Sequence, residues 1–281
     1  MNRRGTSGLK LERARVVEHD EIAAGMFLMW LSCPAVAKGA TSGRFLMIHC
    51  SDSLDPLLPR PMSFHRFRQA PVPPRPPQRE RGLGGEGTSD RQFAILYDVR
   101  GRGTAWLASR KPGDEITVFG PLGRGYELAS DAQNVLLVAG GMGVAAVISL
   151  ADEAIAAGRS VTLLQGARTE GLLFPHSLLP TDVEAVSATD DGSAGHHGLV
   201  TGLLAEHLPW ADQTFACGPN PMFASMADVV KGARSRKPVQ ALLEERMGCG
   251  TGVCYGCAVF SRKGVRLVCR DGPRFDLREV F

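Results

Sequence analysis

Hydrophobic and polar residues follow two different patterns, one before and one after about residue 130. In the first part, short β-rich segments recur, and glycine or proline stands between most of them. These segments cover residues 9–18, 26–32, 44–50, 93–100 and 115–119. Several short strands at such spacing predict a small antiparallel barrel.

In the second part, largely apolar strands alternate with helices. The run at 134–139 is typical of a buried parallel strand, and a helical stretch follows at 144–157. Further strands are expected at 160–165, 182–188 and 213–216, and further helices around Leu172 to Leu178, at 198–207 and at 221–233. This alternation predicts a doubly wound parallel sheet with right-handed crossovers.

The two patterns divide the chain into a barrel domain at 1–128, a nucleotide-binding α/β domain at 129–236 and a C-terminal segment at 237–281. A length of 281 residues with 44% hydrophobic content suits about two domains and an appendage. Residues 70–91 interrupt the barrel with five prolines and four glycines, a composition that buries too little apolar surface to become ordered. We expect a flexible insertion there.

Charge and hydropathy exclude several classes of function. The formal net charge of +3 is too small to indicate a nucleic-acid or anionic-membrane partner. The longest early apolar run, at 26–31, is too short to cross a bilayer. Of seven cysteines, three remain outside a C-terminal group of four, and this odd number favours a reducing compartment over a disulfide framework. We therefore expect a cytoplasmic protein.

Four cysteines near the C-terminus carry the most specific chemistry. Cys249, Cys254 and Cys257 share one glycine-rich loop, and Cys269 follows after eleven residues. This C-x4-C-x2-C…C spacing is that of plant-type [2Fe-2S] proteins. Zinc also accepts four thiolates, but its sites usually pair two short knuckles, so we favour iron-sulfur over zinc. Such a centre passes single electrons, which indicates electron transfer.

Two loops of the α/β half are candidates for nucleotide binding. Each follows a strand, at the carboxyl edge where such sheets bind ligands. They consist of Gly140, Gly141, Met142 and Gly143, and of Cys217, Gly218 and Pro219. The first opens a helix, whose N–H groups can receive phosphates, although a tight turn also favours glycine for steric reasons alone. Cys217 either faces a nicotinamide or is a small buried core residue.

The barrel half contains a proline-stiffened segment in which a cation and a hydroxyl stand three residues apart. Arg60 can hold a phosphate there while Ser63 meets a ring nitrogen. An aromatic strand and a glycine turn downstream are ordinary when taken alone, but they add surface for a nucleotide. The candidate residues are Arg60, Pro61, Met62, Ser63, Leu96, Tyr97, Asp98, Gly103 and Thr104.

Together these motifs resemble the ferredoxin-NADP reductase superfamily and, within it, the dihydroorotate dehydrogenase B (NAD+) electron-transfer subunits. Segments 244–250 and 268–273 look like the cluster segment of that family, and the resemblance spans nearly the whole chain. It implies that the barrel residues bind FAD and that the two loops bind NAD. It also implies a [2Fe-2S] cluster on Cys249, Cys254, Cys257 and Cys269.

The resemblance further implies a function. A catalytic partner subunit with FMN would oxidise dihydroorotate, and its electrons would pass through the cluster and FAD to NAD+ in pyrimidine (UMP) biosynthesis. Two copies of each subunit would form a heterotetramer. Nothing in the sequence resembles a base for dihydroorotate deprotonation, so the chain alone should not turn over that substrate.

Other functions remain open. The same cofactors occur in small subunits of NADH-dependent ferredoxin:NADP oxidoreductases, sulfide dehydrogenases and cytoplasmic hydrogenases. A regulator that keeps the flavin fold without turnover is the non-enzymatic alternative. The choice between NAD and NADP depends on contacts after the second α/β strand, where Arg168 is either a 2′-phosphate partner or a solvent-facing cation.

Overall fold

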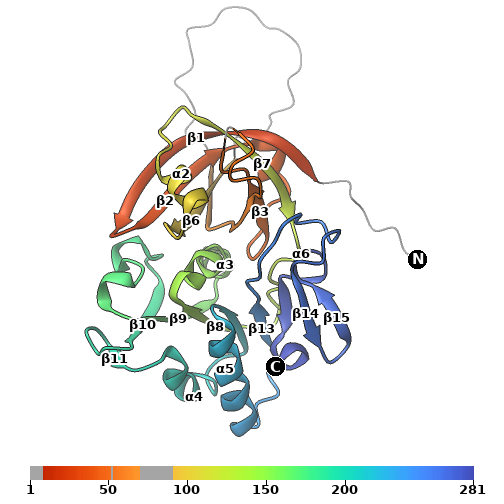
Figure 1. The fold of residues 1–281 in the computed structure, drawn as a ribbon. Coiled ribbons are helices and arrows are strands. Elements are labelled where there is room, and N and C mark those ends of the chain that lie inside the picture. Colours follow the sequence, from red (N-terminus) through yellow and green to blue (C-terminus); the bar gives the residue numbers. More distant parts are fainter. Residues whose placement is uncertain (1–8, 52, 70–90) are drawn as a thin grey trace, which may run out of the picture.

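The computed structural model describes residues 9–51, 53–69 and 91–281, and most of its strands belong to two seven-stranded sheets (Figure 1). The first sheet is antiparallel, with the order β4-β3-β7-β1-β2-β6-β5. Its strands are β1 (Lys10–Ala23), β2 (Met26–Ser32), β3 (Phe45–Ile48), β4 (Arg60–Ser63), β5 (Arg66–Gln69), β6 (Arg91–Asp98) and β7 (Glu115–Leu122). Two short helices, α1 (Pro34–Ala37) and α2 (Arg102–Ala108), accompany it.

The first sheet closes into a barrel through the chain itself. Its two edge strands, β4 and β5, are separated only by Phe64 and His65. The N–H of Phe64 donates to Arg44 O at 3.2 Å, and the N–H of His65 donates to Ala94 O at 2.8 Å. The connection is therefore hydrogen-bonded to Arg44, directly before β3, and to Ala94 in β6. The predicted antiparallel barrel is confirmed.

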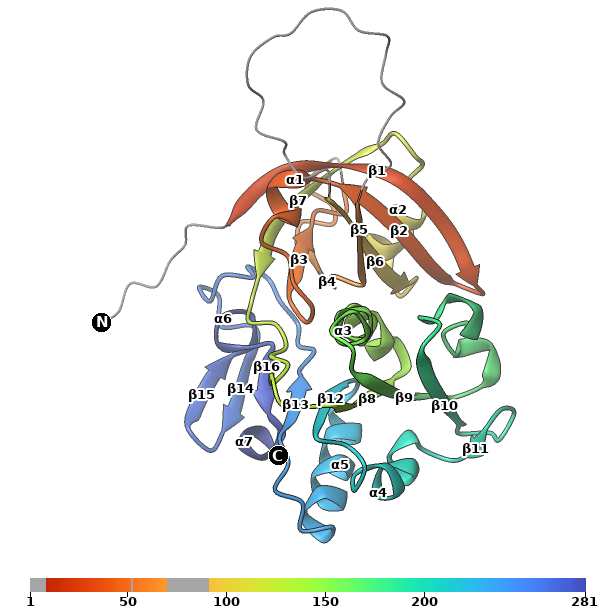
Figure 2. The same cartoon turned by 180° about the vertical axis from the view of Figure 1, so that it is seen from behind.

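The second sheet has the order β11-β10-β9-β8-β12-β13-β16 and is parallel except for its last pair. Its strands are β8 (Asn134–Gly140), β9 (Ser160–Ala167), β10 (Val183–Thr189), β11 (His196–His197), β12 (Gln213–Cys217), β13 (Val239–Leu242) and β16 (Arg274–Asp276). Figures 1 and 2 show α3 (Val144–Ala156) on the barrel side of the sheet, and α4 (Leu204–His207) and α5 (Asn220–Gly232) on the other side. The predicted doubly wound sheet is confirmed.

One predicted helix was wrong and another is shorter than expected. Around residues 172–178 the chain forms two 3-10 turns, η2 (Glu170–Leu172) and η3 (His176–Leu178), with Pro175 between them. Proline cannot continue a helix because it lacks an N–H and its ring clashes with the preceding turn. The stretch at 198–207 is divided between η4 (Val200–Leu203) and α4.

The C-terminal segment at 237–281 contributes to the second sheet. Strands β13 and β16 are its last two members, and the hairpin of β14 (Ala258–Ser261) and β15 (Gly264–Leu267) lies between them in the sequence. Two short helices follow, α6 (Val268–Asp271) and α7 (Leu277–Val280). The domain boundaries at 128 and 236 remain predictions.

The insertion predicted at 70–91 falls outside the described residues except for Arg91, the first residue of β6. Within the described part of the chain, no helix is long and apolar enough to cross a membrane.

Helix α3 joins the two halves, because one of its faces contacts the barrel connection between β4 and β5. The contacts are Ser149 Oγ to Phe64 O (3.1 Å), His65 Nδ1 to Ala145 O (3.1 Å) and Arg66 Nε to Asp152 Oδ2 (2.9 Å). Positions 145, 149 and 152 recur at the spacing of a single helix face. The helix therefore fixes the barrel over the carboxyl ends of the sheet strands.

His65 is completely buried in this interface. A carbonyl only accepts, so Nδ1 carries the proton in the contact with Ala145 O. The Nε2 atom has no hydrogen-bond partner. Loss of hydration on burial lowers the pKa of His65 to about 3, so the imidazole is neutral near pH 7.

We expect His65 to make the protein less stable in mild acid. The unfolded imidazole takes up a proton near pH 6.5, whereas the folded one resists protonation until about pH 3. The free energy of unfolding should therefore fall by about 2 kcal/mol between pH 7 and pH 5 through this group. Urea titrations at both pH values measure the loss. His65→Gln keeps a donor for Ala145 and should lose less, and equal losses in both proteins would contradict the prediction.

Candidate functional site

A cavity of about 800 Å³ lies where the barrel, the α/β sheet and the C-terminal segment meet. Eight of the nine predicted barrel residues line it: Arg60, Pro61, Met62, Ser63, Leu96, Tyr97, Asp98 and Thr104. The α/β half adds Met142, Ala145 and Asn220, and the C-terminal segment adds residues 242–247. The structure therefore brings the predicted FAD residues together in one cavity.

Gly103, the ninth predicted residue, does not line this cavity but packs against Arg60, which does. The expected turn at 101–104 is instead the start of α2, with Gly101 as its N-cap residue. A Cβ atom on Gly103 would lie only 2.9 Å from Arg60 Nε. Glycine at this position thus leaves room for the guanidinium that points to the cavity.

Tyr97 is held by residues that do not themselves line the cavity. Its hydroxyl lies 2.8 Å from His19 Nε2, and His19 Nδ1 lies 2.7 Å from Arg110 O. Since the carbonyl only accepts, Nδ1 donates to it and Nε2 accepts from the phenol. The ring also stacks on Phe27 at a centroid distance of 5.7 Å, so its position is fixed before any ligand binds.

A second cavity, of about 900 Å³, opens at the carboxyl ends of β8, β9 and β10. Four predicted nucleotide residues line it: Gly140, Gly141, Met142 and Pro219. Gly143, Cys217 and Gly218 do not, because they make the close approach of the two loops: a Cβ atom on Gly143 would lie 1.9 Å from Cys217 O. Arg168 and Asp190 also face this cavity.

The two cavities share a wall made of Asp98, Arg100, Met142 and Glu244. Sequence reasoning missed Arg100 and Glu244 as site residues. The signal for Glu244 was its place directly after the apolar run of β13, at the sheet edge that binds ligands. Ligands in the two cavities would therefore both contact these side chains.

Cys217 is fully buried and stands behind Glu244, with its Sγ 3.4 Å from Glu244 Oε1. Burial and the nearby carboxylate raise the pKa of Cys217 well above its usual value, so the thiol is neutral and donates. Glu244 is accessible to solvent through the cavities that it lines. Loss of hydration inside the protein still raises its pKa, although the hydrogen bond from Cys217 acts in the opposite direction. Contact of Cys217 with a nicotinamide remains a prediction.

The four predicted cluster ligands lie in the loop after β13 and in α6. Backbone N–H groups point at three of their sulfur atoms: Thr251 N and Cys254 N to Cys249 Sγ (3.4 and 3.5 Å), Gly256 N to Cys254 Sγ (3.4 Å) and Cys269 N to Cys257 Sγ (3.4 Å). Burial raises the pKa of Cys249, but the N–H groups of Cys254 and Thr251 outweigh it and lower this pKa to about 5. Such amides stabilise thiolates, the form that binds metal.

These contacts associate the thiols in two pairs, Cys249 with Cys254 and Cys257 with Cys269. Within residues 9–51, 53–69 and 91–281, no three His, Cys, Asp or Glu side chains are placed to hold a metal ion together. Four thiols in two neighbouring pairs are a donor set that a [2Fe-2S] core would accept.

The chain is similar to known proteins along nearly its whole length. The family model of the iron-sulfur cluster binding domain of dihydroorotate dehydrogenase B matches residues 244–281. The dihydroorotate dehydrogenase B (NAD(+)) electron transfer subunit of Desulforamulus reducens is 34% identical over 278 residues, covering 96% of this chain and 98% of its own. That of Geobacillus thermodenitrificans is 35% identical over 274 residues, with 96% and 98% covered. The chain belongs to this family of electron transfer subunits.

Solved structures place the dihydroorotate dehydrogenase B electron transfer fold among the ferredoxin reductases. The structure of an NADH-dependent reduced ferredoxin-NADP oxidoreductase superposes with a TM-score of 0.76 at 28% identity, covering 95% of this chain and 89% of that one. A ferredoxin reductase of carbazole 1,9a-dioxygenase reaches 0.65 at 20% identity, with 82% and 67% covered, and shows the fold alone. The expected superfamily is confirmed.

Gly103→Ala should weaken FAD binding about tenfold, because the new methyl group displaces the Arg60 guanidinium and one charge-assisted contact is lost. Gly101→Ala is the matched control, since its Cβ atom meets nothing within 4 Å and its φ of −177° is ordinary extended backbone. Fluorescence titration of the flavin-free proteins with FAD measures both affinities. Equal affinity in the two variants would contradict the assignment of Arg60.

Cys269→Ser should lose the visible absorbance of the cluster and most of its bound iron, whereas Cys50→Ser should keep both. Cys50 is an equally buried thiol of the barrel and is not one of the four predicted ligands. Metal analysis of the protein purified without oxygen should give iron and sulfide in equal amounts. Zinc in place of iron would refute the [2Fe-2S] assignment.

Proposed function

We propose that this chain is the electron-transfer subunit of an NAD-dependent dihydroorotate dehydrogenase of the cytoplasm. Electrons from the FMN of a catalytic partner subunit would pass through [2Fe-2S] and FAD to NAD+, in pyrimidine biosynthesis. One observation carries the proposal: residues 244–247 line the FAD cavity, and Cys249 follows two residues later. The cluster loop is thus the continuation of the cavity wall.

The roles of the chain's residues follow from the cavities. A bound flavin exchanges two electrons with nicotinamide and single electrons with an iron-sulfur cluster. Arg60 would hold the FAD phosphates, and Ser63 would meet the ring system from β4. The first 3-10 turn, η1 (Gly141–Gly143), would present N–H groups to the phosphates of NAD. The shared wall would let the two rings approach while the rest of each nucleotide stays in its own cavity.

Cys217 would act in this scheme through Glu244. The thiol is buried and neutral and donates to Glu244 Oε1, so it would fix the carboxyl group at the junction of the cavities. Direct contact of Cys217 with the nicotinamide would require movement of Glu244. Cys217 does not itself line the second cavity, so we expect its loss to affect hydride transfer more than the affinity for the nucleotide.

A catalytic partner is supported by the relatives, which are named as electron transfer subunits of a larger enzyme. The C-terminal segment carries the exposed Cys254 and large apolar side chains in contact with solvent: Val253 and Tyr255 beside Cys254 in the sequence, and Phe260 and Val265 on the β14–β15 hairpin. Such exposed side chains near a redox centre suit a covering subunit. We propose a heterotetramer with two copies of each chain.

A second candidate has its own support. The NADH-dependent reduced ferredoxin-NADP oxidoreductase superposes over 95% of this chain at 28% identity. A small subunit of that kind would work with a larger iron-sulfur flavoprotein and not with an FMN subunit. The higher identity of the curated relatives, at 34% and 35%, favours dihydroorotate oxidation.

Co-expression with the product of a neighbouring gene for an FMN-binding barrel enzyme tests the proposal. The purified complex should reduce NAD+ when dihydroorotate is added, and this chain alone should reduce dyes with NADH but not oxidise dihydroorotate. A complex that forms but reduces no NAD+ with dihydroorotate would refute the proposal.

Cys217→Ala should slow the NADH-driven bleaching of flavin about tenfold or more with little change in the Kd for NADH.

A further inference from the structure

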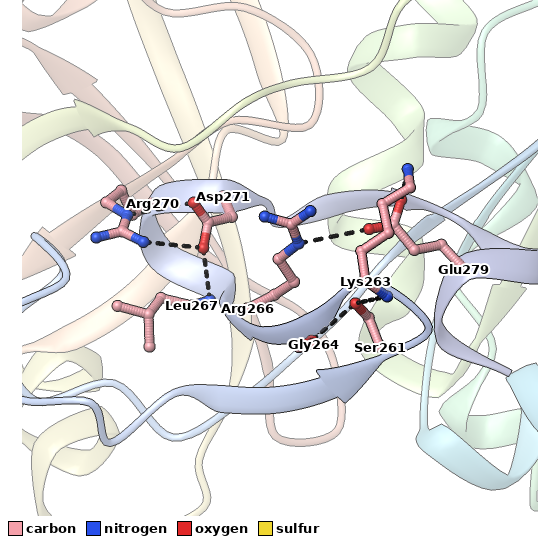
Figure 3. A network of polar contacts seen from close by, with 8 residues as sticks. All are labelled: Ser261, Lys263, Gly264, Arg266, Leu267, Arg270, Asp271 and Glu279. Atoms are coloured by element: carbon pink, nitrogen blue, oxygen red, sulfur yellow. Dashed lines mark hydrogen bonds and ion pairs between the residues drawn. The ribbon is translucent and has the colours of Figure 1, made fainter. Parts of the chain in front are cut away.

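Arg270 and Asp271 form an ion pair directly after the predicted ligand Cys269 (Figure 3). Arg270 Nε lies 3.2 Å from Asp271 Oδ1, and its Nη2 lies 3.3 Å from Oδ2. Asp271 Oδ2 also accepts the backbone N–H of Leu267 at 2.8 Å. The carboxylate thereby closes the turn that carries Cys269 and holds the guanidinium in one orientation.

The stem of Arg270 lies against the cluster loop. Gly252, at a φ of +85°, lacks a side chain where a Cβ atom would lie 3.1 Å from Arg270 Cδ. Gly252 follows Thr251, whose N–H points at Cys249 Sγ, and precedes Cys254 by two residues. Arg270 therefore bridges the two segments that supply the four thiolates.

The guanidinium of Arg270 is a permanent cation, because arginine stays protonated in proteins. Its side chain is 57% exposed, whereas that of Asp271 is 18% exposed. The field of a cation so placed acts on the thiolates, and dissolved salt screens part of that field.

A second basic group of the same segment points elsewhere. Arg266 Nε lies 3.5 Å from Glu279 Oε1, and Lys263 Nζ lies 2.9 Å from Glu279 Oε2. Figure 3 shows Arg266 between Asp271 and Glu279, with its guanidinium turned toward Glu279 and with Lys263 on the far side of that carboxylate. Arg266 therefore carries the same charge as Arg270 but is directed to α7 and not to the cluster loop.

We infer that Arg270, held by Asp271 against Gly252, raises the reduction potential of the [2Fe-2S] centre, an inference that rests on the proposed function. Reduction adds one negative charge to the centre, and a fixed cation nearby stabilises that charge. The ion pair with Asp271 keeps the cation from turning into solvent. The chain thus favours acceptance of a single electron at the point where a partner would deliver it.

The test is a redox titration of the holoprotein, followed by the electron paramagnetic resonance signal of the reduced cluster. Arg270→Gln should shift the one-electron equilibrium about threefold toward the oxidised form, or ~28 mV at 59 mV per tenfold. Arg270→Lys should restore most of the shift, because it keeps the charge. Arg266→Gln is the matched control and should leave the potential near that of the wild type.

Two further readouts separate a field effect from structural damage. The signal of Arg270→Gln should keep the wild-type line shape, and its shift should shrink as salt is raised, because an exposed charge is screened. An unchanged potential in Arg270→Gln, or an equal shift in Arg266→Gln, would overturn the inference while leaving the proposed function intact. A wild-type protein without any reducible cluster would overturn both.

Discussion

The packing of α3 on the barrel connection is the constraint on which the rest of the structure depends. Three contacts along one face of α3 fix residues 64–66, and the same connection closes the barrel between β3 and β6. Both cavities border this junction, because Met142, which lines each of them, lies between the end of β8 and the start of α3. Burial of an uncharged imidazole at its centre ties the geometry of the cofactor sites to the protonation state of a single residue.

The cluster segment is built into the α/β sheet and does not stand apart from it. Strand β13 runs parallel to β12 and leads into the wall of the cavity that the predicted FAD residues line, and β16 returns antiparallel to β13 after the hairpin. The segment with all four cysteines is thus anchored at both ends by strands of the sheet. A rigid base of this kind suits electron transfer, in which donor and acceptor must keep a constant separation.

The sequence allowed the alternation of strands and helices and most residues of the first cavity to be predicted, because each depends on local patterns. The four cysteines as cluster ligands stay a prediction. The helix around 172–178 was wrong because the leucine spacing outweighed Pro175 in the prediction. The pattern at 101–104 predicts a turn where α2 in fact begins after its N-cap Gly101, since glycine suits both. Glu244 and the closure of the barrel depend on contacts between distant segments, and no local pattern records them.

The wall shared by the two cavities has a thermodynamic consequence. Asp98, Arg100, Met142 and Glu244 each border both spaces, so a molecule that shifts any of them on entering one space alters the shape and field of the other. Linkage then requires reciprocity: whatever factor a dinucleotide imposes on the retention of the prosthetic group, that group imposes on the dinucleotide. A single coupling free energy therefore links the affinity for the dinucleotide to the affinity for the prosthetic group.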